Sequence, residues 1–174
     1  MKPRGMAVIA TALFLLLSGC AKHSVTVKMH KVSDTGEGAD MGDIIITPTK
    51  KGVQFQVDLK GFTPGEHGFH IHQNPSCAAG EKEGKLVAAL AADGHFDPHH
   101  TKKHAGPYGN GHLGDLPRLI ANDKGEIHMA VIAPRLTMKD LKGHSLMIHM
   151  GGDNYTDTPP MGGGGARVSC GVMN

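Results

Sequence analysis

The chain has 174 residues, of which 39% are hydrophobic and 20% are charged, and its 18 basic side chains nearly balance 16 acidic ones. The chain lacks the strong positive charge of a nucleic-acid-binding protein, so we expect no nucleic-acid partner. A chain of this length suits one domain with a buried core.

The first twenty residues have the pattern of a targeting segment. Lys2 and Arg4 precede an apolar run over residues 6–17, and these two residues account for the small basic excess of the chain. The run is too short to cross a bilayer, for which roughly 20 residues are needed, and is typical of a secretory signal. It ends in Leu-Ser-Gly-Cys at residues 17–20, which is similar to the bacterial lipobox, where the cysteine is lipidated and becomes the N-terminus.

These signals predict three parts. We expect a signal peptide over residues 1–19, a lipidated tether over 20–24 and a single domain over 25–174. Cys20 would then be the only attachment to a membrane, and the protein would lie in the bacterial periplasm or cell envelope. An ordinary signal peptide with a nearby cleavage site is the alternative.

The remaining cysteines are few enough to interpret together. If Cys20 carries lipid, Cys77 and Cys170 remain in an oxidising compartment, where a disulfide between them would persist. Two buried free thiols are the alternative. No C-x-x-C motif is present, so we do not expect cysteine to bind a metal.

The sequence after the proposed tether predicts a series of short strands. Alternating or β-branched runs bounded by turn residues predict strands over 25–29, 43–47, 53–59, 66–72, 116–121, 127–133, 145–149 and 166–172. Residues 34–42 and 151–165 are expected to be loops. Residues 84–92 have the only helical propensity and could be a short helix or a loop with one helical turn, and 136–141 could form one helical turn. Seven or eight short strands predict an all-β sandwich or barrel.

A histidine-rich segment lies between the predicted strands. Residues 95–115 contain five histidines, many glycines and prolines, and few apolar residues, so we expect a metal ion to order them. His95, His104, His112 and Asp115 offer three imidazoles and a carboxylate, a set that suits tetrahedral zinc. A solvated loop is the alternative, although loops longer than about 15 residues are usually functional or disordered.

A second group of histidines could bind another ion. His70 and His72 are two residues apart, so a strand would direct both imidazoles to one face. His149, in another predicted strand, and His95 could complete a site of four imidazoles. Such nitrogen-only coordination suits a copper ion that changes oxidation state. One deprotonated imidazole has two nitrogens, so His95 could bind both ions.

Several segments resemble the copper,zinc superoxide dismutases in their bacterial secreted form. They are G-F-H-I-H at 68–72, G-H-F-D-P at 94–98, K-H-A-G-P at 103–107, G-H-L-G-D-L at 111–116 and G-G-A-R-V-S-C-G-V at 164–172. The resemblance covers nearly the whole mature chain. It implies an all-β fold, an immunoglobulin-like, eight-stranded antiparallel Greek-key barrel or sandwich with two long loops.

The resemblance also implies roles for particular residues. Copper ligands would be His70, His72, His95 and His149, and zinc ligands would be His95, His104, His112 and Asp115. Arg167 would guide and hold the superoxide anion near copper, and His95 would take up and return a proton. Asp153 would hydrogen-bond a copper histidine and a zinc histidine. His67 would support the metal ligands without binding a metal itself, and Cys77 would form a disulfide with Cys170.

The implied function is dismutation of superoxide to dioxygen and hydrogen peroxide, which protects the cell envelope. Copper would cycle between Cu(II) and Cu(I), while zinc would hold the shared His95 without changing oxidation state. A monomer and a homodimer are both compatible with the sequence. A copper-storage protein would use the same histidines but would require neither Arg167 nor a bridging ring. A zinc hydrolase would need an open zinc position.

Overall fold

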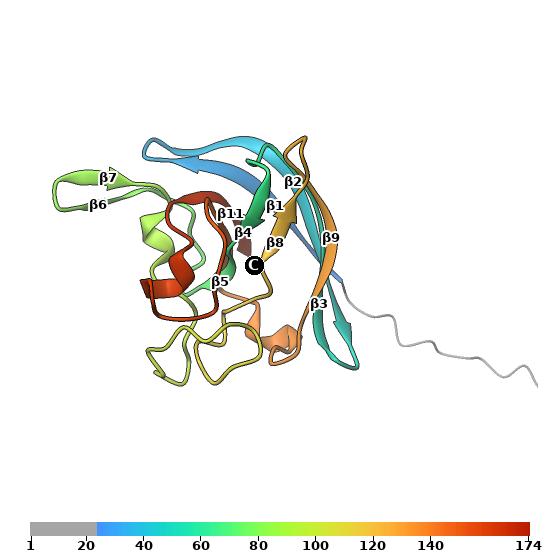
Figure 1. The fold of residues 1–174 in the computed structure, drawn as a ribbon. Helices are drawn as coiled ribbons and strands as arrows, with labels where there is room; N and C mark the ends of the chain where they lie inside the picture. Colours follow the sequence, from blue (N-terminus) through green and yellow to red (C-terminus); the bar gives the residue numbers. More distant parts are fainter. Residues whose placement is uncertain (1–23) are drawn as a thin grey trace, which may run out of the picture.

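The structure, a computed structural model, describes residues 24–174 (Figure 1). Seven strands form one curved antiparallel sheet in the order β5-β10-β11-β1-β2-β3-β9, while β4 pairs with β8 and β6 pairs with β7. The strands are β1 Val25–Ser33, β2 Gly36–Thr49, β3 Gly52–Lys60, β4 Gly65–His67, β5 Phe69–His72, β6 Gly80–Lys82, β7 Lys85–Val87, β8 Leu119–Ala121, β9 Glu126–Ala133, β10 His144–His149 and β11 Arg167–Met173. Three short 3₁₀ helices are η1 Leu90–Ala92, η2 Met138–Asp140 and η3 Pro160–Gly163.

The predicted antiparallel all-β fold is confirmed. The strand expected over residues 66–72 is interrupted at Gly68 and forms β4 and β5. If these two are counted as one, the sheet and the β4–β8 pair contain the eight predicted strands, and the β6–β7 hairpin is an addition. The helical turn expected near residue 138 is present as η2.

Two segments differ from the prediction. Residues 36–42, expected to be a loop, form the first half of β2, because β1 extends to Ser33 and supplies backbone partners as far as the Ser33–Gly36 pair. Residues 84–92 contain a single helical turn, which is one of the two predicted forms, but also a strand that was not predicted. Their first part pairs with β6 in a hairpin, and Ala89, with φ of 49°, separates this hairpin from the single turn η1. Strand pairing therefore overrides the local loop or helical propensity in both segments.

Apolar side chains fill the interior of the curved sheet. The largest of those that are fully buried are Phe55, Phe69, Met29, Ile44, Ile46, Leu59, Ile71, Leu116, Leu119, Ile127, Leu146 and Met147. The rings of Phe55 and Phe69 meet edge to face, with centroids 5.5 Å apart, an arrangement that aromatic quadrupoles favour. Met147 belongs instead to a smaller cluster with Cys77 and Cys170, on the other face of β10.

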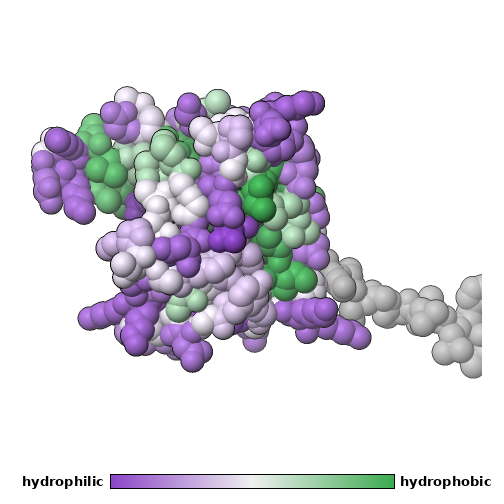
Figure 2. Space-filling view, in the orientation of Figure 1, coloured by the Kyte–Doolittle hydropathy of each residue, from purple (hydrophilic) through white to green (hydrophobic). Residues whose placement is uncertain are grey.

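The surface is largely hydrophilic in the view of Figure 2. Hydrophobic surface lies over the β6–β7 hairpin, whose Leu86 is 60% exposed. Within residues 24–174, no helix is both long and apolar enough to cross a membrane.

Candidate metal centre

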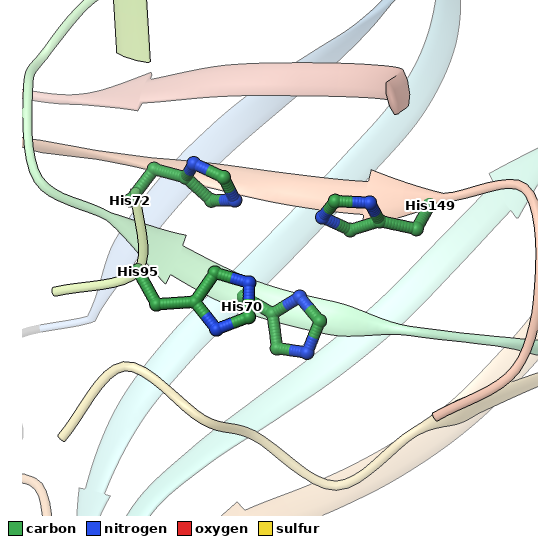
Figure 3. A group of neighbouring side chains, drawn as sticks. All are labelled: His70, His72, His95 and His149. Atoms are coloured by element: carbon green, nitrogen blue, oxygen red, sulfur yellow. The ribbon is translucent and has the colours of Figure 1, made fainter. Parts of the chain in front are cut away.

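Strands β5 and β10 place three histidines on the outer wall of the barrel. Side chains alternate between the two faces of a strand, so Phe69 and Ile71 enter the core while His70 and His72 point to the opposite face. In β10, Leu146 and Ile148 face the core in the same way and His149 lies outside it. The pairing of β5 with β10 brings these histidines together (Figure 3).

The histidine-rich segment is attached to the free edge of β5. The Phe96 N–H donates to the Ile71 carbonyl at 2.8 Å, and the Ile71 N–H donates to the Gly114 carbonyl at 2.8 Å. The backbone of Gly114 lies so close to the Ile71 carbonyl that any Cβ there would clash. Phe96 and Leu116 are also buried in the core. Backbone pairing and two apolar anchors therefore help to order this segment, in addition to the metal ion that the sequence predicts.

Arg135 is a further support of this segment that the sequence did not indicate. Its guanidinium donates hydrogen bonds to four carbonyl groups of the segment, those of Gly106, Pro107, Gly111 and His112. One planar group with five N–H donors therefore fixes the turn that precedes His112.

Four histidines form the first candidate metal group. His70, His72, His95 and His149 are buried, and each offers a ring nitrogen that lies within 4.8 Å of those of the other three. The rings converge on a common centre (Figure 3).

Hydrogen bonds determine which nitrogen three of these rings direct to that centre. The other nitrogen of each ring is occupied: His70 Nε2 by an Asp153 carboxylate oxygen at 2.7 Å, His72 Nδ1 by the Asp93 carbonyl at 2.7 Å, and His149 Nδ1 by the Gly165 carbonyl at 3.0 Å. This arrangement leaves His70 Nδ1, His72 Nε2 and His149 Nε2 buried without a hydrogen-bond partner.

Asp115 is the centre of the second candidate group. Its Oδ1 atom lies 3.0 Å from His95 Nδ1, 3.0 Å from His104 Nδ1 and 3.3 Å from His112 Nδ1. A ligand atom of His70 also lies within 4.8 Å of those of His95, His104 and Asp115, because the rings of His70 and His95 stack at 3.9 Å. We assign His70 to the first group, where its unpaired nitrogen accompanies two others from β5 and β10.

Asp153 connects the two groups. Its two carboxylate oxygens accept hydrogen bonds from His70 Nε2 and His104 Nε2, each at 2.7 Å. The Asp153 carbonyl accepts a hydrogen bond from Arg118 Nη1 at 3.2 Å. Gly162 packs directly on the Asp153–His104 contact, where a Cβ would clash with both side chains. Partners of this kind fix the orientation and tautomer of metal-binding histidines.

His67 lies behind the first group. It is buried, and its Nδ1 and Nε2 atoms are 2.7 Å from the His149 carbonyl and 2.8 Å from the Thr63 carbonyl. It therefore positions the backbone of His149 and does not point its ring at the common centre.

The two groups differ in their charge. Burial lowers the pKa of His149 to about 4 and lowers the pKa values of His70 and His72 well below the usual range, so these imidazoles are neutral at neutral pH, the form that binds metals. Burial opposes ionisation of Asp115, but the adjacent imidazoles of His104, His112 and His95 hold the Asp115 pKa far below its usual range. The first group is thus neutral and the second contains a carboxylate.

The ring nitrogens fit two bound metal ions. Within residues 24–174, six buried side-chain nitrogen or oxygen atoms lack a hydrogen-bond partner, and five of them are ring nitrogens of these two groups. Besides the three of the first group, they are His104 Nδ1 and His112 Nδ1, which lie near Asp115 Oδ1 but without the geometry of a hydrogen bond. An unpaired buried polar atom costs free energy, and coordination to an ion removes that cost. Four imidazoles suit copper, and three imidazoles with a carboxylate suit zinc.

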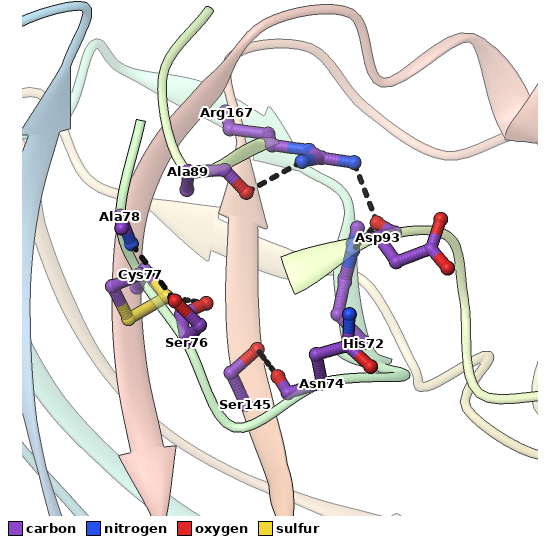
Figure 4. Close-up of a disulfide and its surroundings, with 10 residues drawn as sticks. His72, Asn74, Ser76, Cys77, Ala78, Ala89, Asp93, Ser145 and Arg167 are labelled. Carbon is purple, nitrogen blue, oxygen red and sulfur yellow. Dashed lines mark hydrogen bonds between the residues drawn. A yellow bond between two sulfur atoms is a disulfide. The ribbon is translucent and has the colours of Figure 1, made fainter. Parts of the chain in front are cut away.

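Arg167 is held beside the first group by a loop that a disulfide fixes (Figure 4). Its Nη1 and Nη2 atoms donate to the carbonyls of Ala89 at 2.6 Å and Asp93 at 2.7 Å. The predicted disulfide is confirmed: Cys77 is bonded to Cys170 of β11, with Cα atoms 5.7 Å apart. Cys20 lies outside the described residues.

Comparisons with known proteins agree with this chemistry. A family model described as copper/zinc superoxide dismutase matches residues 40–173. The superoxide dismutase [Cu-Zn] of Brucella abortus is 51% identical over 167 residues, covering 95% of this chain and 96% of the relative, and that of Escherichia coli is 48% identical over 175 residues, covering 99% of both.

Solved structures agree as well. The Cu/Zn superoxide dismutase from Brucella abortus has a TM-score of 0.86 and 53% identity, and the monomeric copper, zinc superoxide dismutase from Salmonella enterica has a TM-score of 0.79 and 50% identity. Each match covers 87% of this chain and 100% of the other. The chain therefore belongs to the copper/zinc superoxide dismutase family, and it is an enzyme that uses copper and zinc to convert superoxide into dioxygen and hydrogen peroxide.

Proposed function

We propose that the two groups of the metal centre divide the two ions of this dismutase between them. Copper is held by His70, His72, His95 and His149, and zinc by His95, His104, His112 and Asp115. The observation that carries this assignment is the set of five unpaired ring nitrogens, three in one group and two in the other. Copper, when bound, supplies the chemistry of accepting one electron from superoxide and giving one to the next.

His95 is proposed as the shared ring and as a proton carrier. Its Nδ1 atom faces Asp115 in the zinc group, which leaves Nε2 for the copper group. Burial lowers the pKa of His95, so its ring releases a proton readily. When Nε2 does not bind copper, it would hold a proton, which it can pass to the departing peroxide.

Arg167 is proposed to capture the substrate anion. The guanidinium is a permanent cation, and its two anchoring carbonyls fix it beside His72. Copper storage would need the four histidines but no fixed cation next to them, so the position of Arg167 favours the enzyme. A positive group beside the metal-binding histidines also increases the encounter rate with an anion, and enzymes that act on superoxide are an established example of this effect.

Replacing Arg167 with Ala is expected to lower kcat/KM for superoxide by about tenfold to a hundredfold, the usual worth of a hydrogen bond to a charged group. Copper and zinc contents should each remain near those of the wild type, because Arg167 is not a proposed ligand. The rate is measured by rapid mixing and the metals by atomic absorption. Arg167→Lys is the matched control, which keeps the charge but not the two-carbonyl anchor, and it should give an intermediate rate. Loss of either metal from Arg167→Ala would contradict this role.

We further propose that the protein is secreted and held at the cell envelope through lipidated Cys20, with residues 1–19 as the signal peptide and 20–24 as the tether. Residues 1–23 lie outside the described part of the chain. The disulfide supports an oxidising compartment, where such bonds persist. The first strand begins at Val25, so the proposed tether leads directly into the domain.

The Cys20→Ser variant is expected to lose membrane association when the full-length chain is expressed in a bacterium. Each buried CH₂ of an acyl chain contributes about 0.8 kcal/mol to membrane binding. Serine lacks the sulfur atom to which the lipid would be attached, so the variant loses this contribution. Detergent-phase partitioning measures the effect, with Ser24→Ala in the proposed tether as the control that should partition like the wild type. A wild-type protein found entirely in the aqueous phase would contradict the anchor.

A further inference from the structure

The main-chain carbonyl of Asp93 is shared by two groups of the site. Arg167 Nη2 and His72 Nδ1 each donate to it at 2.7 Å (Figure 4). The first is the proposed anion-binding cation, and the second belongs to the first metal group. This one carbonyl oxygen therefore sets the position of the Arg167 guanidinium relative to His72. A displacement of the carbonyl would move both groups.

The backbone of Asp93 adopts a conformation that ordinarily requires glycine. Its φ of 64° and ψ of −155° lie in a region that is essentially restricted to glycine. The strain persists because the carbonyl is held by two donors. Ala89, whose carbonyl holds the other end of the guanidinium, also has a positive φ of 49°. The segment that anchors Arg167 is thus strained at both anchor points.

The side chain of Asp93 has a different role from its carbonyl. The side chain is exposed, and within residues 24–174 its carboxylate makes no hydrogen bond or ion pair. Its charge nevertheless acts on Arg167: burial lowers the pKa of the guanidinium, and the Asp93 carboxylate raises it in opposition. A solvated negative charge therefore stands beside the cation that is proposed to attract superoxide.

We propose that Asp93 limits the rate of anion capture through its carboxylate, while its carbonyl holds Arg167 and His72 in place. The proposal rests on the role assigned to Arg167. A negative charge close to Arg167 repels a superoxide anion and offsets part of the attraction of the guanidinium. Removing that charge should accelerate capture, provided that the carbonyl keeps its position.

Two substitutions separate the charge from the strain. Asp93→Asn removes the charge and keeps a non-glycine residue in the strained conformation. Asp93→Gly removes the charge and the strain together. Asp123→Asn, in the exposed turn between β8 and β9, removes one negative charge elsewhere and is the matched control.

At low ionic strength, both Asp93 variants are expected to raise kcat/KM for superoxide by about two- to threefold over the wild type and over Asp123→Asn. At about 1 M salt the Debye length is roughly 3 Å, so the effect of the Asp93 charge is screened. The wild type, both Asp93 variants and Asp123→Asn should then have similar values of kcat/KM. No increase in Asp93→Asn at low salt, or an equal increase in Asp123→Asn, would overturn the role of the charge.

Thermal unfolding of the metal-free proteins tests the backbone separately from activity. Asp93→Gly is expected to raise Tm by about 2 °C or more, because relief of the strain exceeds the added entropy of a glycine in the unfolded chain, while Asp93→Asn should leave Tm nearly unchanged. An unchanged Tm in Asp93→Gly would overturn the proposed strain. If instead the role assigned to Arg167 were wrong, kcat/KM for superoxide would be unchanged in Arg167→Ala, so the two failures can be distinguished.

Discussion

Replacing His149 with Ala is expected to lower superoxide dismutation by more than about a hundredfold and to remove most of the copper. His149 supplies one of the four nitrogens of the first group, and its Nε2 atom is buried without a partner. Loss of a residue that merely supports a metal ligand typically costs 10- to 100-fold in affinity or activity, so loss of a ligand should cost more. Metal analysis and rapid-mixing assays of the metal-loaded protein measure both effects.

The zinc content distinguishes this result from general unfolding. His149 does not belong to the Asp115 group, so the His149→Ala variant should keep zinc close to one ion per chain. His128→Ala is the matched control, because His128 is half exposed on β9 and pairs with Asp58 on the outer face of the sheet. Its activity should equal that of the wild type. Unchanged copper and activity in His149→Ala would refute the proposed copper site.

Removal of the disulfide by Cys77→Ala with Cys170→Ala is expected to lower the free energy of unfolding by roughly 4 to 5 kcal/mol. The bond joins residues 93 positions apart, and closing so long a loop restricts the unfolded chain strongly. Alanine is preferred to serine because both sulfurs lie in an apolar cluster with Met147. Denaturant unfolding of the metal-free protein measures the loss, and Tm should fall by about 10 °C or more.

The same double variant should also lose activity. The disulfide fixes the segment from residue 77 to 93 to β11, and that segment supplies the carbonyls of Ala89 and Asp93 that hold Arg167. When the segment loosens, the guanidinium loses its fixed position beside His72. Reduced wild-type protein is the control and should behave like the variant. A double variant as stable as the oxidised wild type would contradict the stabilising role of the bond.

The sequence was informative where side chains alternate or recur at short spacing. Residues 53–59 alternate cleanly, and β3 extends over Gly52–Lys60. The two-residue spacing of His70 and His72 placed both rings on one face of a strand, and the structure has them there. Local propensity was less informative in residues 84–92, because pairing with β6 decides the conformation of their first part.

Groups that act on the backbone of distant segments could not be predicted. Arg135 holds the histidine-rich segment, and Arg118 holds Asp153, but each donates to main-chain carbonyls that every residue possesses. Such contacts leave no pattern of residue types along the chain. The same is true of Asp93, whose carbonyl is the functional group and whose residue type would not suggest a glycine-like backbone.

By itself, the sequence predicted the class of fold and the candidate metal ligands, because strand periodicity and ligand spacing are properties of neighbouring residues, and the resemblance of its motifs indicated the family. Only the tertiary structure decided which nitrogen of each histidine is left for a metal, because that choice depends on what occupies the other nitrogen. For His70 this is Asp153, 83 positions away, and for His149 it is a carbonyl in the second long loop. Such partners meet only when the barrel has closed and its loops have packed against β5 and β10.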